Sequence, residues 1–146
     1  SKHGVLVRIS TLGRAPGCVA CHTAEAHRPA DAARMDLVCG RCHSPRYVAT
    51  LRANGARMIE VGNMKQREAL ALLTRARAEF PAATLRDMET HYRHLLQHLR
   101  NLRLGVAHQS PDYQWWHGHP ALDGDLLRLK GAYDALVRGR AAKSKQ

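Results

Sequence analysis

The stretch LRDMETHYRHLLQHLRNL, residues 85–102, decides the fold. Its apolar residues alternate at intervals of three and four, which is the spacing of a heptad seam along one face of a helix. The seam consists of Leu85, Met88, Tyr92, Leu95, Leu99 and Leu102. The pattern predicts a long helix of about five turns that packs along its length. The seam has two possible purposes: it packs into an internal core, or it forms an interface with a partner.

Two further helices are expected on either side of this stretch. One runs from Asn63, a residue suited to the N-cap, to about residue 80. Pro81 is expected in the first turn of the seam helix, and Gly105 with the turn QSPDY (109–113) at its end. A last helix is expected from about Asp125 to Arg138. The inward residues would be Ala69, Leu73, Ala76 and Phe80 in the first helix, and Leu126, Leu129, Tyr133, Leu136 and Val137 in the last.

These patterns predict an all-α fold in three parts. Residues 1–60 would form an irregular segment of loops and short helices. Residues 61–139 would form a helical hairpin or a three-helix bundle. Residues 140–146, which are basic and rich in small side chains, would be a disordered tail.

The charge balance points to acidic partners. The 146 residues include 23 Lys and Arg against 12 Asp and Glu, which gives a net charge of +11, and ten histidines besides. Such a surface favours an acidic protein, a polyanion or an anionic membrane face. No apolar run is long enough for a transmembrane helix. We expect the chain to be a mature protein from which a signal peptide has been removed, because it opens abruptly at Ser1.

The four cysteines form two pairs with the same pattern. GCVACH (17–22) and CGRCH (39–43) each place a histidine directly after a C-x-x-C pair, and 17 residues separate the pairs. Two disulfides, a four-cysteine zinc site and two covalent c-type haems are all compatible with the cysteine spacing. Only haem attachment requires the histidine, because that residue ligates the iron of the haem bound by the two thiols. Haem is therefore the favoured interpretation.

The motifs thus predict two c-type haems with defined ligands. Cys18 and Cys21 would attach one haem, Cys39 and Cys42 the other, with His22 and His43 as the proximal iron ligands. Electron-transfer haem needs a second, stable axial ligand. The candidate distal ligands are His3, His27 and His108.

The other histidines receive less specific interpretations. His91, His94 and His98 follow one another at intervals of three and four on the seam helix, as a solvated or haem-flanking face would. His117 and His119 lie beside Trp115 and Trp116. We expect these two histidines to serve packing or an interface rather than ligation.

The ordered motifs resemble one known family. SKHG (1–4), APGCVACH (15–22), CGRCHSPRY (39–47) and LGVAHQSPDYQWWHG (104–118), with a long helix before the last, resemble the C-terminal region of hydroxylamine oxidoreductase-like octahaem cytochromes c. The resemblance implies closely stacked haems followed by long helices. It also supports His3 and His108 as distal ligands and leaves the haem served by His27 open.

The same resemblance suggests a role for the aromatic residues near the C-terminus. In hydroxylamine-oxidising members a tyrosine crosslinks to the catalytic haem of a neighbouring subunit, and Tyr113 is a possible counterpart. Alternatively Tyr113, Trp115 and Trp116 form an aromatic anchor at an interface. The chain departs from the family in having two haem motifs instead of eight.

Together these features predict a dihaem electron-transfer subunit. It would exchange electrons with an octahaem hydroxylamine oxidoreductase-like catalytic subunit in a hetero-oligomer, in the bacterial periplasm or an equivalent compartment where c-type haem is attached. Its role in nitrogen metabolism would be to carry electrons rather than to catalyse. Two alternatives remain: a haem enzyme acting on a nitrogen compound with Asp112 or His117 as acid or base, and a zinc-dependent nucleic-acid-binding module.

Overall fold

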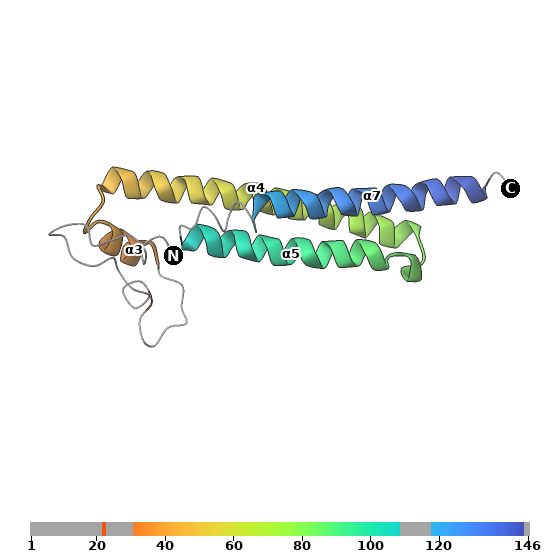
Figure 1. Cartoon of the computed structure of the whole chain (residues 1–146), viewed down its shortest axis with the longest axis horizontal. Helices are drawn as coiled ribbons and strands as arrows, with labels where there is room; N and C mark the ends of the chain where they lie inside the picture. Colours follow the sequence, from red (N-terminus) through yellow and green to blue (C-terminus); the bar gives the residue numbers. More distant parts are fainter. Residues whose placement is uncertain (1–21, 23–30, 109–117, 145–146) are drawn as a thin grey trace. The chain divides into compact units, whose positions relative to one another are not determined.

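The computed structural model describes residues 22, 31–108 and 118–144, and every regular element in these ranges is helical. In chain order the elements are α3 (Ala32–Cys39), α4 (Pro45–Glu79), the 3₁₀ turn η1 (Ala82–Thr84), α5 (Arg86–Ala107) and α7 (His119–Lys143) (Figure 1). The all-α prediction is confirmed for these residues. The chain divides into two compact units, residues 1–56 and 57–146. The division lies inside α4, close to the boundary expected after residue 60.

In the first unit, two short-range contacts begin the helices. The carboxylate of Asp31 accepts a hydrogen bond from the backbone N–H of Arg34 at 2.7 Å and caps α3. The hydroxyl of Ser44 accepts one from the N–H of Tyr47 at 3.3 Å, immediately before α4. Pro45 follows at the first helical position, where its missing N–H costs nothing. The chain between the two helices is therefore a short turn.

The second unit is a three-helix bundle around the predicted seam. Leu85, Met88, Leu95, Leu99 and Leu102 are all buried, and Tyr92 packs partly buried against them. α4 contributes Ala69, Leu73 and Ala76, and α7 contributes Leu122, Leu126, Leu129 and Tyr133. α5 and α7 lie side by side with the C-terminal half of α4 (Figure 1). The seam thus forms the core of the chain.

Predicted boundaries were wrong in all three helices of the bundle, the first at Asn63. α4 begins at Pro45 and passes straight through this residue. The Asn63 side chain is not a cap: its amide donates to Glu60 at 3.5 Å and accepts from Arg103 on α5 at 2.9 Å. The preceding residues contain no proline after Pro45, and glycine alone weakens a helix without ending it. Tertiary contacts with α5 offset this weakness.

The start of α5 also differs from the prediction. Pro81 is extended, with φ −59° and ψ 140°, and leads into η1 before α5 begins at Arg86. The Thr84 hydroxyl donates to the Pro81 carbonyl at 2.7 Å, which stabilises this turn. α5 continues past Gly105 to Ala107, and the QSPDY turn lies outside the described residues.

The last helix is longer than predicted at both ends. α7 starts at His119 with Pro120 in its first turn, where proline is tolerated. It continues to Lys143, so residues 140–143 are helical and the expected disordered tail is wrong there. Arg140 explains part of this extension, because its guanidinium lies 3.3 Å from Glu79 and 4.8 Å from the centre of the Phe80 ring. Positively charged side chains in the last turn also interact favourably with the helix dipole.

Gly62 on α4 lies directly against leucine side chains of α5 and α7. A Cβ built at this position would lie 2.7 Å from Leu102 Cδ2 and 2.9 Å from Leu99 Cδ1, with Leu122 Cδ1 at 3.6 Å. Both of the first distances are too short for carbon atoms. A side chain at this position would require Leu99 and Leu102, which are both buried, to move.

We expect the same substitution to have opposite effects at two helical glycines. Gly131, on α7, has nothing within 4 Å of its missing Cβ, so Gly131→Ala should stabilise the protein by about 1 kcal/mol through helix propensity. Gly62→Ala gains the same propensity but overpacks the core, which costs roughly 1–3 kcal/mol. Urea unfolding of both variants measures the difference. Equal stabilisation by both would contradict the close packing.

Glu79 at the end of α4 gathers partners from two helices. Its carboxylate accepts from Arg75 at 2.7 Å and from the Tyr133 hydroxyl at 3.2 Å, and Arg140 lies 3.3 Å away. Hydrogen bonding from Arg75 is the largest cause that lowers the pKa of Glu79 below its ordinary value of 4.5, with smaller contributions from Tyr133 and Arg140. The folded state therefore favours the ionised carboxylate.

This lowered pKa predicts an acid-dependent loss of stability. The contribution of Glu79 is complete above its unfolded pKa and disappears as the pH falls through the lower folded pKa. Glu79→Gln should therefore be less stable than the parent protein at pH 6, with a difference that shrinks steadily from pH 5 to pH 3. Urea midpoints at each pH measure this. Glu68→Gln is the control, because Glu68 has one ion-pair partner, Lys130, and is half exposed; an equal pH dependence in both variants would contradict the assignment.

Candidate functional site

The second C-x-x-C-H motif lies on the tight turn between α3 and α4. Cys39 is the last residue of α3, and its carbonyl accepts hydrogen bonds from the N–H groups of Cys42 at 3.1 Å and His43 at 2.9 Å. Both cysteines are thiols rather than a disulfide; Cys42 is exposed and Cys39 is partly buried. The two thiols and the imidazole are thus held within one turn of chain.

Gly40 lets this turn close. A Cβ at Gly40 would lie 2.6 Å from the carbonyl oxygen of Asp36, a contact that no side chain tolerates without movement of the backbone. The Gly40 N–H itself donates to that carbonyl at 2.9 Å. The first of the two residues between the cysteines is therefore fixed as glycine by the geometry of the helix end.

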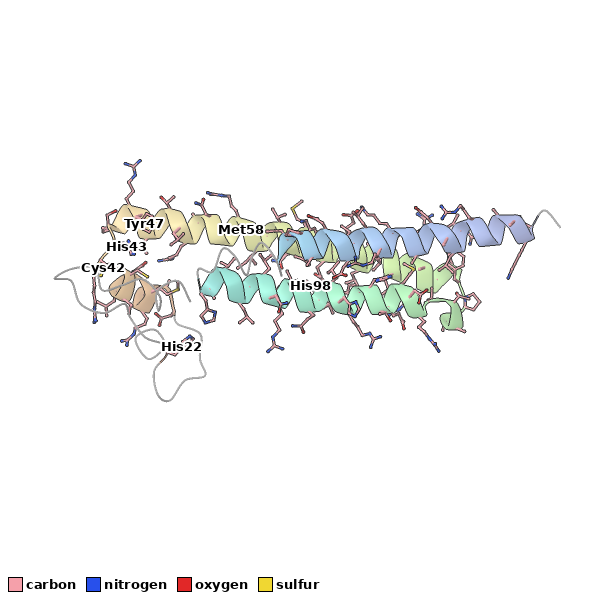
Figure 2. All side chains as sticks on the ribbon, in the orientation of Figure 1. His22, Cys42, His43, Tyr47, Met58 and His98 are labelled. Atoms are coloured by element: carbon pink, nitrogen blue, oxygen red, sulfur yellow. The ribbon has the colours of Figure 1, made fainter. Side chains whose placement is uncertain are left out.

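The imidazole of His43 is oriented by a neighbouring ring. His43 and Tyr47 stack with their ring centroids 4.9 Å apart and their planes 27° apart. Figure 2 shows Cys42, His43 and Tyr47 together at the N-terminal end of α4. His43 is exposed, so the face of its ring that does not contact Tyr47 is accessible to a ligand.

A groove of about 680 Å³ runs beside the motif, within the first unit. Its volume falls in the range of roughly 300–1,000 Å³ that is usual for cofactor and ligand sites. Most of its lining is small or apolar, and Ala49, Ala53 and Ala56 recur on one face of α4. The lining residues are Asp36, Gly40, Pro45, Val48, Ala49, Arg52, Ala53 and Ala56.

One ion pair crosses this groove. The Arg52 guanidinium donates to both carboxylate oxygens of Asp36, at 2.5 and 2.6 Å. The hydrogen bond to Asp36 is the first cause that raises the pKa of Arg52 above its ordinary value. Sequence analysis did not identify this groove. The alanine spacing at 49, 53 and 56 was the only signal available for it.

Most of the other candidate residues from the sequence lie outside the part of the chain that the structure describes. Cys18, Cys21, His3, His27, Tyr113, Trp115 and Trp116 lie outside the described residues, as do Asp112 and His117. His22 is described and is partly buried. The second motif lies entirely within the described residues.

No family model, no curated protein and no solved structure matches this chain. Its function therefore has to be inferred from the chemistry of its own residues. None of the helices in the described ranges has both the length and the apolar character needed to cross a membrane.

His108 lies at the end of α5 with a defined tautomer. It is exposed, and its Nδ1 donates to the carbonyl of Leu104 at 2.9 Å. A carbonyl can only accept, so Nδ1 carries a proton, and Nε2 is the nitrogen that would bind a metal. This is the arrangement found in metal-ligating histidines, whose other nitrogen donates to a backbone carbonyl or a carboxylate.

His119 behaves as a packing residue, as expected. It is partly buried at the start of α7, and Lys65 on α4 approaches its Nδ1 at 3.4 Å. Burial is the first cause that lowers the pKa of His119, and the positive charge of Lys65 adds to it; a backbone hydrogen bond with Met58 and the charge of Asp123 act in the opposite direction. Lys65 also pairs with Asp123 at 2.6 Å. His119 thus joins the polar contacts between α4 and α7.

The histidine stripe on α5 meets a buried carboxylate that sequence analysis missed. Asp125 on α7 is fully buried, and its two oxygens lie 2.6 Å from His98 Nδ1 and 2.6 Å from an Arg128 nitrogen. Figure 2 places His98 on α5. The available signal was the position of Asp125 between Leu122 and Leu129, on the inward face of α7. The face carrying His98 is therefore not simply a solvated one.

Proposed function

We propose that this chain is a dihaem c-type cytochrome that carries electrons to or from an octahaem hydroxylamine oxidoreductase-like catalytic subunit. The observation that supports it most is the repetition of C-x-x-C-H, with the second copy held in one turn by Cys39, Gly40 and His43. Bound haem supplies one-electron redox chemistry at iron. The protein supplies attachment, axial ligands and surroundings.

The second motif has the chemical groups that haem attachment needs. Each thiol, Cys39 and Cys42, would add across one vinyl group, forming a carbon–sulfur bond while the proton goes to the other vinyl carbon. His43 would ligate the iron through its imidazole nitrogen. The adjacent groove offers small, apolar walls on α4, which suit a flat and largely apolar group. The residues present therefore fit the cofactor.

The first motif and the distal ligands complete the proposal. Cys18, Cys21 and His22 would hold the other haem. The distal ligands would come from His3, His27 and His108, and His108 has support from its hydrogen bond to Leu104. With Nδ1 donating to Leu104, Nε2 is the nitrogen that would ligate iron. This supports six-coordinate, electron-transferring haem over the enzymatic alternative.

The proposed partner contact is electrostatic in part. The net charge of +11 favours docking to an acidic surface, where complementary charge raises the rate of association. The heptad seam does not serve this purpose, because it forms the bundle core. The aromatic residues Tyr113, Trp115 and Trp116 remain the proposed contact residues. We place the complex in the periplasm or an equivalent compartment, in keeping with c-type haem attachment.

We expect two haems per chain. We also expect that each of two histidine variants loses the proximal ligand of one haem. The reduced protein should show sharp low-spin bands, and the pyridine haemochrome should give two haems per chain. His43→Ala and His22→Ala should each remove one low-spin signal, because each deletes one proximal imidazole. Thr50→Ala, an exposed change on α4, is the control and should leave both signals. A protein without haem absorption but with zinc on its four cysteines would overturn the proposal in favour of the zinc alternative.

His108→Ala should leave both haems attached but make one of them high-spin and able to bind carbon monoxide, because one axial ligand is lost. The Soret band of the reduced protein, recorded with and without carbon monoxide, measures this. His108→Met should restore a six-coordinate spectrum, since methionine is also an axial ligand. An unchanged spectrum in His108→Ala would make His108 structural. Carbon monoxide binding by the parent protein would instead favour the enzyme with an open haem.

A further inference from the structure

Three metal-binding side chains converge between α5 and α7, in the second compact unit. His91 and His94 lie three residues apart on one face of α5, and Asp125 comes from α7. Each offers one ligand atom, and these atoms all lie within 4.8 Å of one another. None of the three belongs to a C-x-x-C-H motif. The cluster is therefore independent of the haem-binding residues.

The carboxylate in this cluster is already oriented. Asp125 is fully buried, with one oxygen held by His98 and the other by Arg128, each at 2.6 Å. An ionised carboxylate offers about four acceptor positions, so two hydrogen bonds leave room for a metal bond. Ligating carboxylates are commonly fixed by hydrogen bonds of this kind. His98 and Arg128 thus approach the two carboxylate oxygens from different helices and fix the direction of the carboxylate.

His91 carries a buried polar atom that a metal ion would satisfy. Its Nδ1 is buried and has no hydrogen-bond partner. Buried polar atoms are nearly always paired, and an unpaired one is costly. His94 is exposed, so an ion from solvent can reach the cluster through this side chain.

The donor set identifies the class of ion. Two imidazoles and one carboxylate suit zinc and its transition-metal neighbours, whereas calcium and magnesium prefer oxygen ligands alone. Around a tetrahedral zinc ion with bonds of 2.0–2.2 Å, ligand atoms lie about 3.4 Å apart. Closing the present spacing of up to 4.8 Å needs a movement of up to about 1.4 Å, and His94, which is exposed, is the ligand with the most freedom to move.

We propose that His91, His94 and Asp125 bind one divalent ion of the zinc class, which ties α5 to α7. His98 and Arg128 are positioning residues that hold the carboxylate. Three protein ligands leave a fourth position for water. The ion adds a bond between two helices that also meet through buried apolar side chains and the His98–Asp125 pair.

The test is zinc binding by the full chain in its haem-loaded form. The protein is stripped with a chelator, dialysed against graded zinc, and analysed for zinc and iron together, so that zinc per chain is counted against haem iron. We expect one tightly bound zinc per chain and a rise in the thermal unfolding temperature when zinc is added, because the ion binds the folded form. His94→Ala should weaken this zinc by at least tenfold and abolish the rise.

Two further variants strengthen the test. His98→Gln should weaken binding by about 10–100-fold, the effect usual for residues that orient a ligand. Gln97→Ala is the matched control and should bind like the parent, because Gln97 is exposed on α5 and donates to Asn101 Oδ1 at 3.1 Å. Asp125→Asn should also lose zinc, but its burial makes misfolding a second cause. His94 is exposed, so its variant decides the question even if Asp125→Asn does not fold.

Two results would overturn the proposal. One is the absence of stoichiometric zinc in the parent chain. The other is unchanged zinc affinity in His94→Ala, which would place the ion on other histidines of the chain. Haem content and the low-spin spectrum should be the same in His94→Ala and the parent, so failure of the zinc site is distinguishable from failure of the haem proposal.

Discussion

Burial of the α5 seam is the interaction on which the rest of the described structure depends. Leu95 and Leu102 are completely buried between α4 and α7, and each buried leucine side chain contributes about 1.5–3 kcal/mol relative to exposure. This packing determines which polar residues meet across the bundle. Glu79 reaches Tyr133, and His98 reaches Asp125, only because the leucine layers hold the helices in one register.

Regular apolar spacing made the bundle predictable from sequence. The alternation of three and four from Leu85 to Leu102 has few other physical solutions, so both the helix and its inward face followed from it. The ends of helices were less predictable. Asn63 is suited to a cap, but a cap matters only where the helix ends, and no local feature ends α4 there. Arg140 extends α7 through contacts with Glu79 and Phe80, which lie far away in sequence.

The candidate sites also differ in how well the sequence predicts them. The C-x-x-C-H motifs carry their chemistry in consecutive residues, so the predicted roles of Cys39, Cys42 and His43 needed no tertiary information. Asp125 and the histidines of α5 come from different helices, and a single sequence does not show that a carboxylate on one helix faces an imidazole on another. The stripe at 91, 94 and 98 was visible, but its partner was not. The groove along Ala49, Ala53 and Ala56 was missed because alanine is common in any helix.

The buried Asp125 also has a consequence for how the bundle avoids incorrect alignments. Leucine layers resemble one another, so apolar burial alone hardly distinguishes two helices that are displaced by one heptad, whereas a single buried polar residue does. Displacing α7 by one heptad in one direction would place Asp125 beside Gly105 and leave a carboxylate without its imidazole. Displacement in either direction would also separate Lys65 from Asp123 and Lys130 from Glu68. The native alignment satisfies all three pairs, so the few polar contacts select one arrangement from several that the leucines alone would permit.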